Sequence, residues 1–182
     1  MIDAENGFWV FGYGSLLWNP EFDYIERTPA VLDGYARSFC MWSIHHRGSV
    51  EVPGLVLALD AQPDASCQGV AFRIGPDFAE KSLADLRERE LVSSAYVEHL
   101  VPLRRPDGRE LQALAYVIDP AHPQYTGALT LDEQADIIAK ATGGRGPNCD
   151  YLFNTASHLI ELGMEDHDLT ELSEKVRQRL CA

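Results

Sequence analysis

The stretch of residues 8–18 reads Phe-Trp-Val-Phe-Gly-Tyr-Gly-Ser-Leu-Leu-Trp. Its first part is a continuous aromatic and apolar run, which is typical of a buried strand. Two glycines around a tyrosine then end the strand, because glycine lets the backbone turn sharply and approach a ligand closely. The resulting tight loop can aim N–H groups at a carboxylate or an oxyanion. The candidate substrate-binding residues of this loop are Gly12, Tyr13, Gly14, Ser15, Leu16 and Leu17.

The loop does not match two other glycine motifs. Leu17 stands where a dinucleotide-binding loop has its third glycine, and leucine follows Ser15 where a nucleophile elbow needs glycine. A strand-end turn without a ligand remains the alternative interpretation of this loop.

Strands dominate the rest of the first half of the chain. A bend is expected near Gly34, and Arg105-Pro-Asp-Gly-Arg109 has the fixed φ, side-chain acceptor and positive-φ residue of a hairpin turn. The expected strands cover residues 30–44, 55–60, 69–74, 96–103 and 111–118.

Helices follow in the second half, after one helix over residues 78–92. Thr130-Leu-Asp-Glu133 has the capping-box pattern and opens a helix that we expect Gly143-Gly144 to close. Further helices are expected over residues 149–162 and from a cap at Asp168 to the C-terminus. This order predicts an α+β fold, a small bent mixed β-sheet or barrel with flanking helices, in a single domain over residues 1–182.

The helix over residues 78–92 places one carboxylate on its apolar side. The apolar stripe that begins at Ala79 reaches Glu90 at helical spacing, whereas Glu88 falls on the polar side. A carboxylate on an apolar face is costly unless it is paired, and such a group can act as a general base. Glu90 is therefore the candidate catalytic residue. The structural alternatives are that it pairs with a core arginine or that it lies past the helix end on the surface.

The segment of residues 43–49, Ser-Ile-His-His-Arg-Gly-Ser, supplies a second candidate. Adjacent histidines in an extended segment point to opposite faces, so they do not bind one metal ion together, and no metal-ligand spacing occurs elsewhere. Arg47 could clamp a substrate carboxylate, or it could tie down a strand end through ordinary hydrogen bonds. Cys40 with one of the histidines is a further, unfavoured nucleophile pair.

Acidic residues outnumber basic ones by 28 to 15, and the formal net charge is −13. Such a surface repels phosphate backbones and anionic membranes, so we expect no nucleic-acid or membrane partner. The apolar stretch of residues 7–18 is too short to span a bilayer, and no basic segment precedes it as in a signal peptide. The cytoplasm is therefore the expected compartment.

An ordered set of motifs resembles the ChaC-like γ-glutamylcyclotransferases over roughly residues 8–160. The set consists of Trp9-Val-Phe-Gly-Tyr-Gly-Ser-Leu-Leu-Trp18, Gly34-Tyr-Ala-Arg-Ser-Phe39, Ser43-x-x-His-Arg-Gly-Ser49, Pro53-Gly54, Cys67-x-Gly-Val-Ala-Phe72, Arg89-Glu90-Leu-Val-Ser-Ser-Ala-Tyr96 and Tyr151-Leu-Phe-Asn-Thr155. Each motif alone is weak, and the order makes the set specific. The chain departs from the family at Ser94 and Ala95, near the usual glycine, and at Ser49, where threonine is usual.

The resemblance implies a small mixed sheet or barrel with flanking helices and a lyase that cleaves glutathione to 5-oxoproline and cysteinylglycine. It implies no cofactor and no metal, and a small-molecule substrate as partner. It assigns the substrate loop to residues 12–17 and the catalytic glutamate to Glu90, and it brings Tyr151 near the pocket.

Three other functions stay open at this stage. The substrate could be another γ-glutamyl amine or amino acid, because the leaving-group side of the pocket lies in loops that the sequence does not place. The protein could bind γ-glutamyl compounds or glutathione as a regulator without turnover. A hydrolase that uses Cys40 or Ser15 as nucleophile is the most distant alternative.

Overall fold

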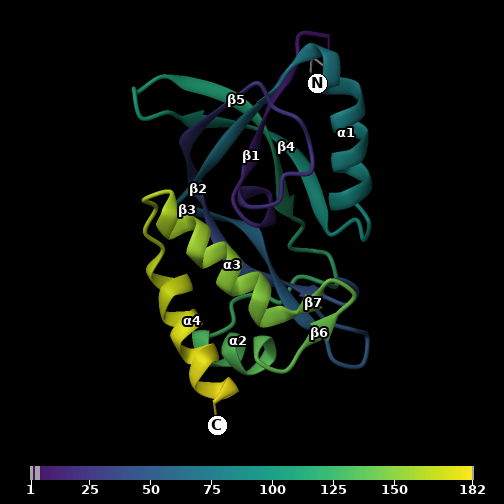
Figure 1. The fold of residues 1–182 in the computed structure, drawn as a ribbon, viewed down its shortest axis with the longest axis vertical. Coiled ribbons are helices and arrows are strands. Elements are labelled where there is room, and N and C mark those ends of the chain that lie inside the picture. The colour runs from purple at the N-terminus through teal and green to yellow at the C-terminus, as the bar shows by residue number, and fades with distance from the viewer. Residues whose placement is uncertain (1, 3–4, 182) are drawn as a thin grey trace. The chain divides into compact units, whose positions relative to one another are not determined.

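The computed structural model describes residue 2 and residues 5–181 (Figure 1). The chain divides into two compact units, the first formed by Met1–Arg37 with Leu59–His122 and the second by Ser38–Ala58 with Pro123–Ala182. The single domain expected over residues 1–182 stays a prediction, and residues 1, 3, 4 and 182 of that range lie outside the described residues.

Five strands form a closed barrel in the order β1-β3-β2-β4-β5. The β1–β3 and β4–β5 pairs are antiparallel, whereas β5 pairs in parallel with both β1 and β3. The barrel with its helices confirms the predicted α+β class and mixed sheet. The strands are β1 Phe8–Gly12, β2 Glu26–Ser43, β3 Gly54–Ile74, β4 Tyr96–Arg104 and β5 Glu110–Ile118.

The predicted hairpin joins β4 to β5. The Arg105 N–H donates to the Arg109 carbonyl at 2.8 Å, the Asp107 carboxylate accepts from the Arg109 N–H, and Gly108 has a φ of 80°. Glycine adopts this positive φ without steric cost, so the turn forms where its residues predict it.

The prediction of two strands over residues 55–60 and 69–74 is wrong, because both belong to the 21-residue strand β3. The connecting residues 61–68 include Pro63 and are mostly exposed, so they carry the composition of a loop. Pairing with neighbouring strands keeps this segment extended although its side chains bury little surface.

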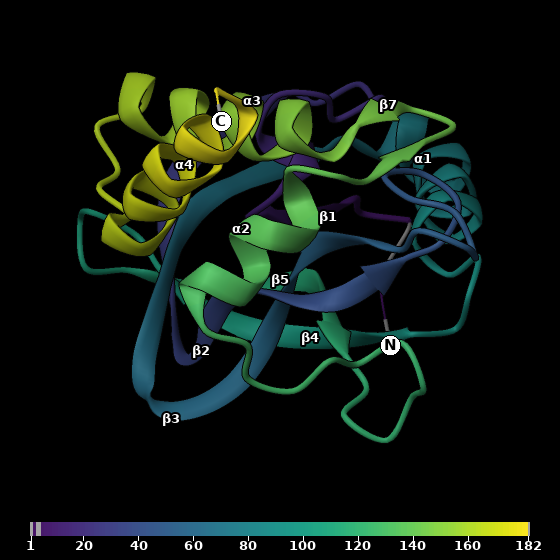
Figure 2. The same cartoon turned by 90° about the horizontal axis from the view of Figure 1, so that it is seen from below.

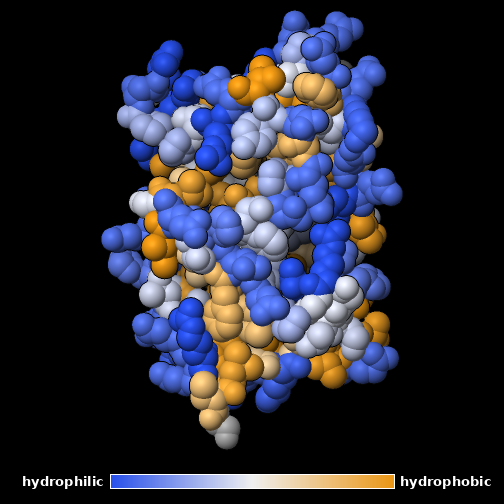
Figure 3. All heavy atoms as spheres, viewed as in Figure 1, coloured by the Kyte–Doolittle hydropathy of each residue, from blue (hydrophilic) through white to orange (hydrophobic). Residues whose placement is uncertain are grey.

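The helix α1, Pro76–Glu90, packs its apolar side against the barrel in the first unit (Figure 1). Ala79 and Leu86 are buried, and Leu83 is partly buried against the same core, so the predicted phase of the helix is confirmed. The surface over α1 is predominantly hydrophilic in Figure 3, as expected for an amphipathic helix. The core beneath it consists of Phe8, Val10, Leu16, Ile74, Leu114 and Tyr116.

Three helices lie together in the second unit (Figure 2), and their order is α2 Leu131–Ile138, α3 Asn148–Glu161 and α4 His167–Leu180. Thr130 and Glu133 form the predicted capping box of α2. Two predicted boundaries are wrong. The helix α2 ends at Ile138 and not at Gly143-Gly144, because residues 142–143 and 146–147 form the short strands β6 and β7. The N-cap of α4 is Asp166 and not Asp168, since the Asp166 carboxylate accepts from the Leu169 N–H.

None of the helices among residues 2 and 5–181 combines the length and apolar composition that a membrane span requires.

Candidate active site

Glu90 is the last residue of α1 and lies on the side of the helix that faces the barrel. Its side chain is 16% exposed, whereas Glu88 is an exposed residue. The position follows from the stripe that begins at Ala79, because residues eleven positions apart on a helix share one side. The prediction that Glu90, and not Glu88, points inward is confirmed.

The loop after β1 turns directly into a short 3-10 helix, η1 Ser15–Leu17. The first helical hydrogen bond runs from the Leu17 N–H to the Gly14 carbonyl, so the N–H groups of Ser15 and Leu16 have no acceptor within the turn. Leu16 and Leu17 are buried and anchor the turn in the core. A Cβ at Gly12 would lie 2.9 Å from the Phe72 ring, which explains the need for glycine there.

Arg89 connects this loop to Glu90. Its Nη2 donates to the Ser15 Oγ at 2.8 Å, and its Nε forms an ion pair with the Glu90 Oε1 at 3.1 Å. The predicted catalytic carboxylate and the predicted substrate loop are therefore brought together in one unit. The sequence alone predicted no role for Arg89, although this residue directly precedes Glu90 in the motif of residues 89–96.

Tyr13 and Tyr116 connect the loop of residues 12–17 to β5 through a buried hydrogen bond. The Tyr13 hydroxyl donates to the Tyr116 carbonyl at 2.8 Å, and both side chains are buried. The Tyr116 hydroxyl donates to the Glu98 carboxylate at 3.3 Å. Burial, and after it the charges of Glu98 and Glu90, raise the pKa of Tyr116 above its usual value, so the phenol stays protonated at neutral pH.

Arg37 fixes the backbone of the loop from a second side. Its Nη1 donates to the carbonyls of Tyr13 and Gln68, at 2.9 Å each. Arg37 lies within the motif of residues 34–39, but the sequence alone predicted no function for it. No local pattern could have shown this role, because the two carbonyls that Arg37 binds lie 24 and 31 positions away in the chain.

Arg47 and Tyr151 belong to the second unit. The Arg47 Nη1 donates to the carbonyls of Arg145 at 2.7 Å and Pro147 at 3.2 Å, and the guanidinium carbon lies 5.7 Å from the centre of the Tyr151 ring. Burial lowers the pKa of Arg47 below its usual value. The Tyr151 hydroxyl accepts from the Leu57 N–H at 3.4 Å. These contacts brace the second unit, and the predicted substrate contacts of both residues stay predictions.

Three of the four cysteines are poorly placed for nucleophilic catalysis. Cys40 and Cys67 are buried, and desolvation raises the pKa of the Cys149 thiol above its usual value, which disfavours the reactive thiolate. Among the described residues, no group of three or more His, Cys, Asp or Glu side chains is arranged to hold a metal ion.

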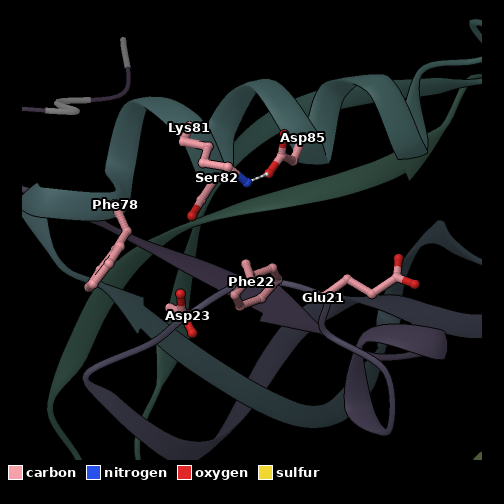
Figure 4. Close-up of a pocket in the computed structure, with 7 residues that line it drawn as sticks. All are labelled: Glu21, Phe22, Asp23, Phe78, Lys81, Ser82 and Asp85. Atoms are coloured by element: carbon pink, nitrogen blue, oxygen red, sulfur yellow. Dashed lines mark hydrogen bonds and ion pairs between the residues drawn. The ribbon is translucent and has the colours of Figure 1, made fainter.

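A pocket of about 330 Å³ lies between α1 and residues 21–23 (Figure 4). Phe78, Lys81, Ser82 and Asp85 line it from the helix, and Glu21, Phe22 and Asp23 line it from the opposite segment. None of the predicted site residues lines this pocket. Lys81 is paired with Asp85 at 2.6 Å, so its charge is already neutralised within the pocket.

Known proteins resemble the chain in sequence and in structure. The family model for ChaC-like proteins matches residues 8–179. The Escherichia coli (strain K12) glutathione-specific gamma-glutamylcyclotransferase is 36% identical, with 97% of this chain and 76% of that protein covered. The Schizosaccharomyces pombe protein of the same name is 35% identical, with 98% and 97% covered.

A crystal structure of a yeast gamma-glutamyl cyclotransferase specific to glutathione superposes with a TM-score of 0.88 at 28% identity, over 95% of this chain and 96% of that one. The match of the family model over nearly the whole chain, together with relatives above 30% identity, shows that the chain belongs to the ChaC-like protein family.

Proposed function

We propose that this protein is a glutathione-specific γ-glutamylcyclotransferase, which cleaves glutathione to 5-oxoproline and cysteinylglycine. Membership of the ChaC-like family and the names of the relatives support the reaction. One observation supports the assignment of the active site. The mostly buried Glu90 carboxylate forms an ion pair with Arg89, and Arg89 also donates to the Ser15 hydroxyl in the loop of residues 12–17.

The reaction is an intramolecular aminolysis. The α-amine of the γ-glutamyl group attacks its own γ-carbonyl carbon, a C–N bond forms in the new ring, and the C–N bond to cysteine breaks. The attacking nitrogen loses two protons overall and the leaving nitrogen gains two, so the reaction balances without water or a cofactor. Ring closure already provides a high effective concentration, and the protein mainly has to hold the folded rotamer.

Glu90 moves the proton in this proposal. The substrate amine is an ammonium ion at neutral pH and cannot attack, so an ionised carboxylate must first take one of its protons. The same group then protonates the leaving amine. A positioned acid–base group of this kind contributes about 10²–10⁴-fold to the rate.

The loop of residues 12–17 binds the anionic parts of the substrate. The N–H groups of Ser15 and Leu16 have no acceptor within η1, so they are suited to hold the α-carboxylate or the oxyanion that develops on the γ-carbonyl. Arg47 and Tyr151 keep a supporting role in the second unit, where Arg47 orders residues 145–147. We place the activity in the cytoplasm, since none of the four cysteines, all of them described, forms a disulfide.

Product identification tests the reaction itself. The purified protein is incubated with glutathione, and the products are separated and identified by mass. We expect 5-oxoproline and cysteinylglycine in equal amounts. Glutamate in place of 5-oxoproline would indicate hydrolysis, and binding of glutathione without any product would indicate a regulator; either result contradicts the proposal. A panel of other γ-glutamyl compounds measured in parallel defines the substrate preference.

Glu90→Gln tests the role of the carboxylate. Glutamine keeps the size of the side chain and its hydrogen bonds but cannot accept a proton, so we expect kcat to fall about 10²–10⁴-fold while the protein stays folded. Glu88→Gln is the matched control, because Glu88 lies on the exposed side of the same helix. Retention of near wild-type kcat by folded Glu90→Gln protein would remove Glu90 as the base. Equal losses in both variants would contradict the assignment of the helix sides.

A further inference from the structure

Arg89 is nearly buried, with a side chain that is 10% exposed, and it uses each nitrogen of its guanidinium group for a different contact. The Nη1 atom donates to the carbonyls of Asn19 at 2.8 Å and Pro20 at 3.4 Å and pairs with the Glu21 carboxylate at 2.9 Å. Residues 19–21 belong to no helix or strand. One side of the guanidinium group therefore orders the irregular segment that follows η1.

The other side of the guanidinium group faces the proposed active site. Its Nη2 donates to the Ser15 Oγ at 2.8 Å, and its Nε pairs with the Glu90 Oε1 at 3.1 Å. Ser15 opens η1, so a contact that fixes its side chain also fixes the start of the turn. A planar cation is thereby placed between the substrate loop and the catalytic carboxylate.

The hydroxyl of Ser15 keeps its own proton available in this arrangement. A serine hydroxyl has one donor and two acceptor positions, and Arg89 occupies an acceptor position. The O–H group can therefore be directed away from Arg89, toward a ligand that the loop holds. The arginine thus sets the direction in which Ser15 donates.

We infer that Arg89 is a positioning residue for the cyclotransfer reaction, which sets the geometry of the Ser15 loop relative to Glu90; this inference rests on the proposed function. The geometry requires arginine. A guanidinium group is a rigid fork with five N–H donors, whereas a lysine ammonium group is a point charge that cannot reach the same acceptors together. Arg87 does not share this position, since it pairs with Glu98 and is 48% exposed.

The test compares Arg89→Lys and Arg89→Ala with wild-type protein in the 5-oxoproline assay, with kcat, KM and melting temperature measured for each. Arg104→Ala is the matched control, because Arg104 binds Asp33 through two nitrogens but lies at the surface of the same unit. We expect Arg89→Ala to lose about 10²-fold in kcat and Arg89→Lys to recover only part of it, since small errors in the position of reacting groups have effects of this size. Arg104→Ala should keep the wild-type kcat.

A readout beyond stability separates positioning from a purely structural role. Added guanidinium ion, at concentrations that leave the melting temperature unchanged, should restore part of the kcat of Arg89→Ala by occupying the vacated space. The same salt should not restore Glu90→Gln. The inference would be overturned if the loss of kcat in Arg89→Ala were fully explained by the fraction of the variant that is unfolded and if guanidinium restored none of it.

Ser15→Ala keeps the inference testable if Arg89→Ala does not fold. It removes only the acceptor of the Arg89 Nη2, so it should lower kcat. In the Ser15→Ala background, Arg89→Lys should lower kcat by a smaller factor than it does in the wild-type protein, because the two residues act through one contact. Wild-type kcat in both Ser15→Ala and Arg89→Lys would overturn the inference while the proposed function stands. A wild-type protein that forms no 5-oxoproline would overturn both.

Discussion

Arg87 and Arg89 lie two positions apart on α1 and have opposite surroundings. Arg89 points toward the loop of residues 12–17, whereas Arg87 points outward and holds the Glu98 carboxylate through Nε at 2.9 Å and Nη2 at 2.8 Å. Glu98 also accepts from the Tyr116 hydroxyl. The hydrogen bonds from Arg87 lower the pKa of Glu98 below its usual value of 4.5, because they stabilise the charged form.

Glu98→Gln should therefore destabilise the protein in a pH-dependent way. The folded-state pKa of Glu98 is below the unfolded value, so its contribution to the free energy of unfolding is complete above pH 4.5 and is lost as the pH falls through the folded-state pKa. We expect a loss of about 1 kcal/mol or less at neutral pH, since the pair is partly exposed to solvent. Urea unfolding of both proteins at neutral pH and at about pH 3.5 measures the difference.

The difference between Glu98→Gln and wild type should shrink at the lower pH. Glu88→Gln is the control, and its effect should be small at either pH because Glu88 is exposed on the same helix. A difference that grows on acidification would show that Glu98 is not stabilised in its charged form.

The elements of this fold begin and end mostly where local chemistry places them. Gly163, with a φ of 69°, follows α3 and ends it, and the Asp-Gly turn closes the hairpin of β4 and β5. The helix α2 starts at a complete capping box, in which the Thr130 Oγ1 accepts from the Glu133 N–H and the Glu133 carboxylate accepts from the Thr130 N–H. Such caps depend only on residues a few positions apart in the chain.

Thr130→Ala should lower the free energy of unfolding by about 1 kcal/mol, because it leaves the Glu133 N–H without its acceptor. Thr130→Ser keeps the hydroxyl and should retain most of the stability. Urea unfolding followed by circular dichroism gives the free energies, and hydrogen exchange shows whether the first turn of α2 loses protection. Equal stability of the alanine and serine variants would contradict a capping role for the hydroxyl.

At the scale of the whole molecule, the net charge of −13 acts against compactness. Ion pairs such as Arg104–Asp33 and Lys175–Asp132 lie at the surface, where each contributes little. Repulsion among the excess carboxylates is spread over the molecule and is screened by salt within about 10 Å at 0.1 M ionic strength.

The melting temperature at neutral pH should therefore rise as sodium chloride is increased from about 10 mM to about 200 mM, because screening weakens the repulsion among the excess carboxylates more than it weakens the exposed ion pairs. Differential scanning calorimetry measures the shift. Potassium chloride at equal ionic strength should give the same result, which distinguishes screening from binding of one ion. A fall of the melting temperature with salt would show that attractive pairs dominate.

Much of the architecture was predictable from local patterns. The run before Gly12 predicted β1, Pro-Asp-Gly predicted the hairpin, and helical spacing selected Glu90 over Glu88. The errors occurred where local composition and tertiary pairing disagree. Residues 61–68 carry the polar residues and proline of a loop, yet they continue β3, because pairing between strands depends on neighbours that are distant in the sequence.

The sequence by itself determined most of the helices and strands and the side of α1 on which Glu90 lies, since periodicity and turn chemistry act over a few residues. Only the tertiary structure decided which distant residues each side chain contacts. Arg89 meets Ser15 across 74 positions of the chain, Tyr13 meets Tyr116 across 103, and Arg47 meets the Arg145 carbonyl across 98. No local sequence pattern predicts such a contact, because it depends on the register of the barrel strands and on which buried donors need an acceptor.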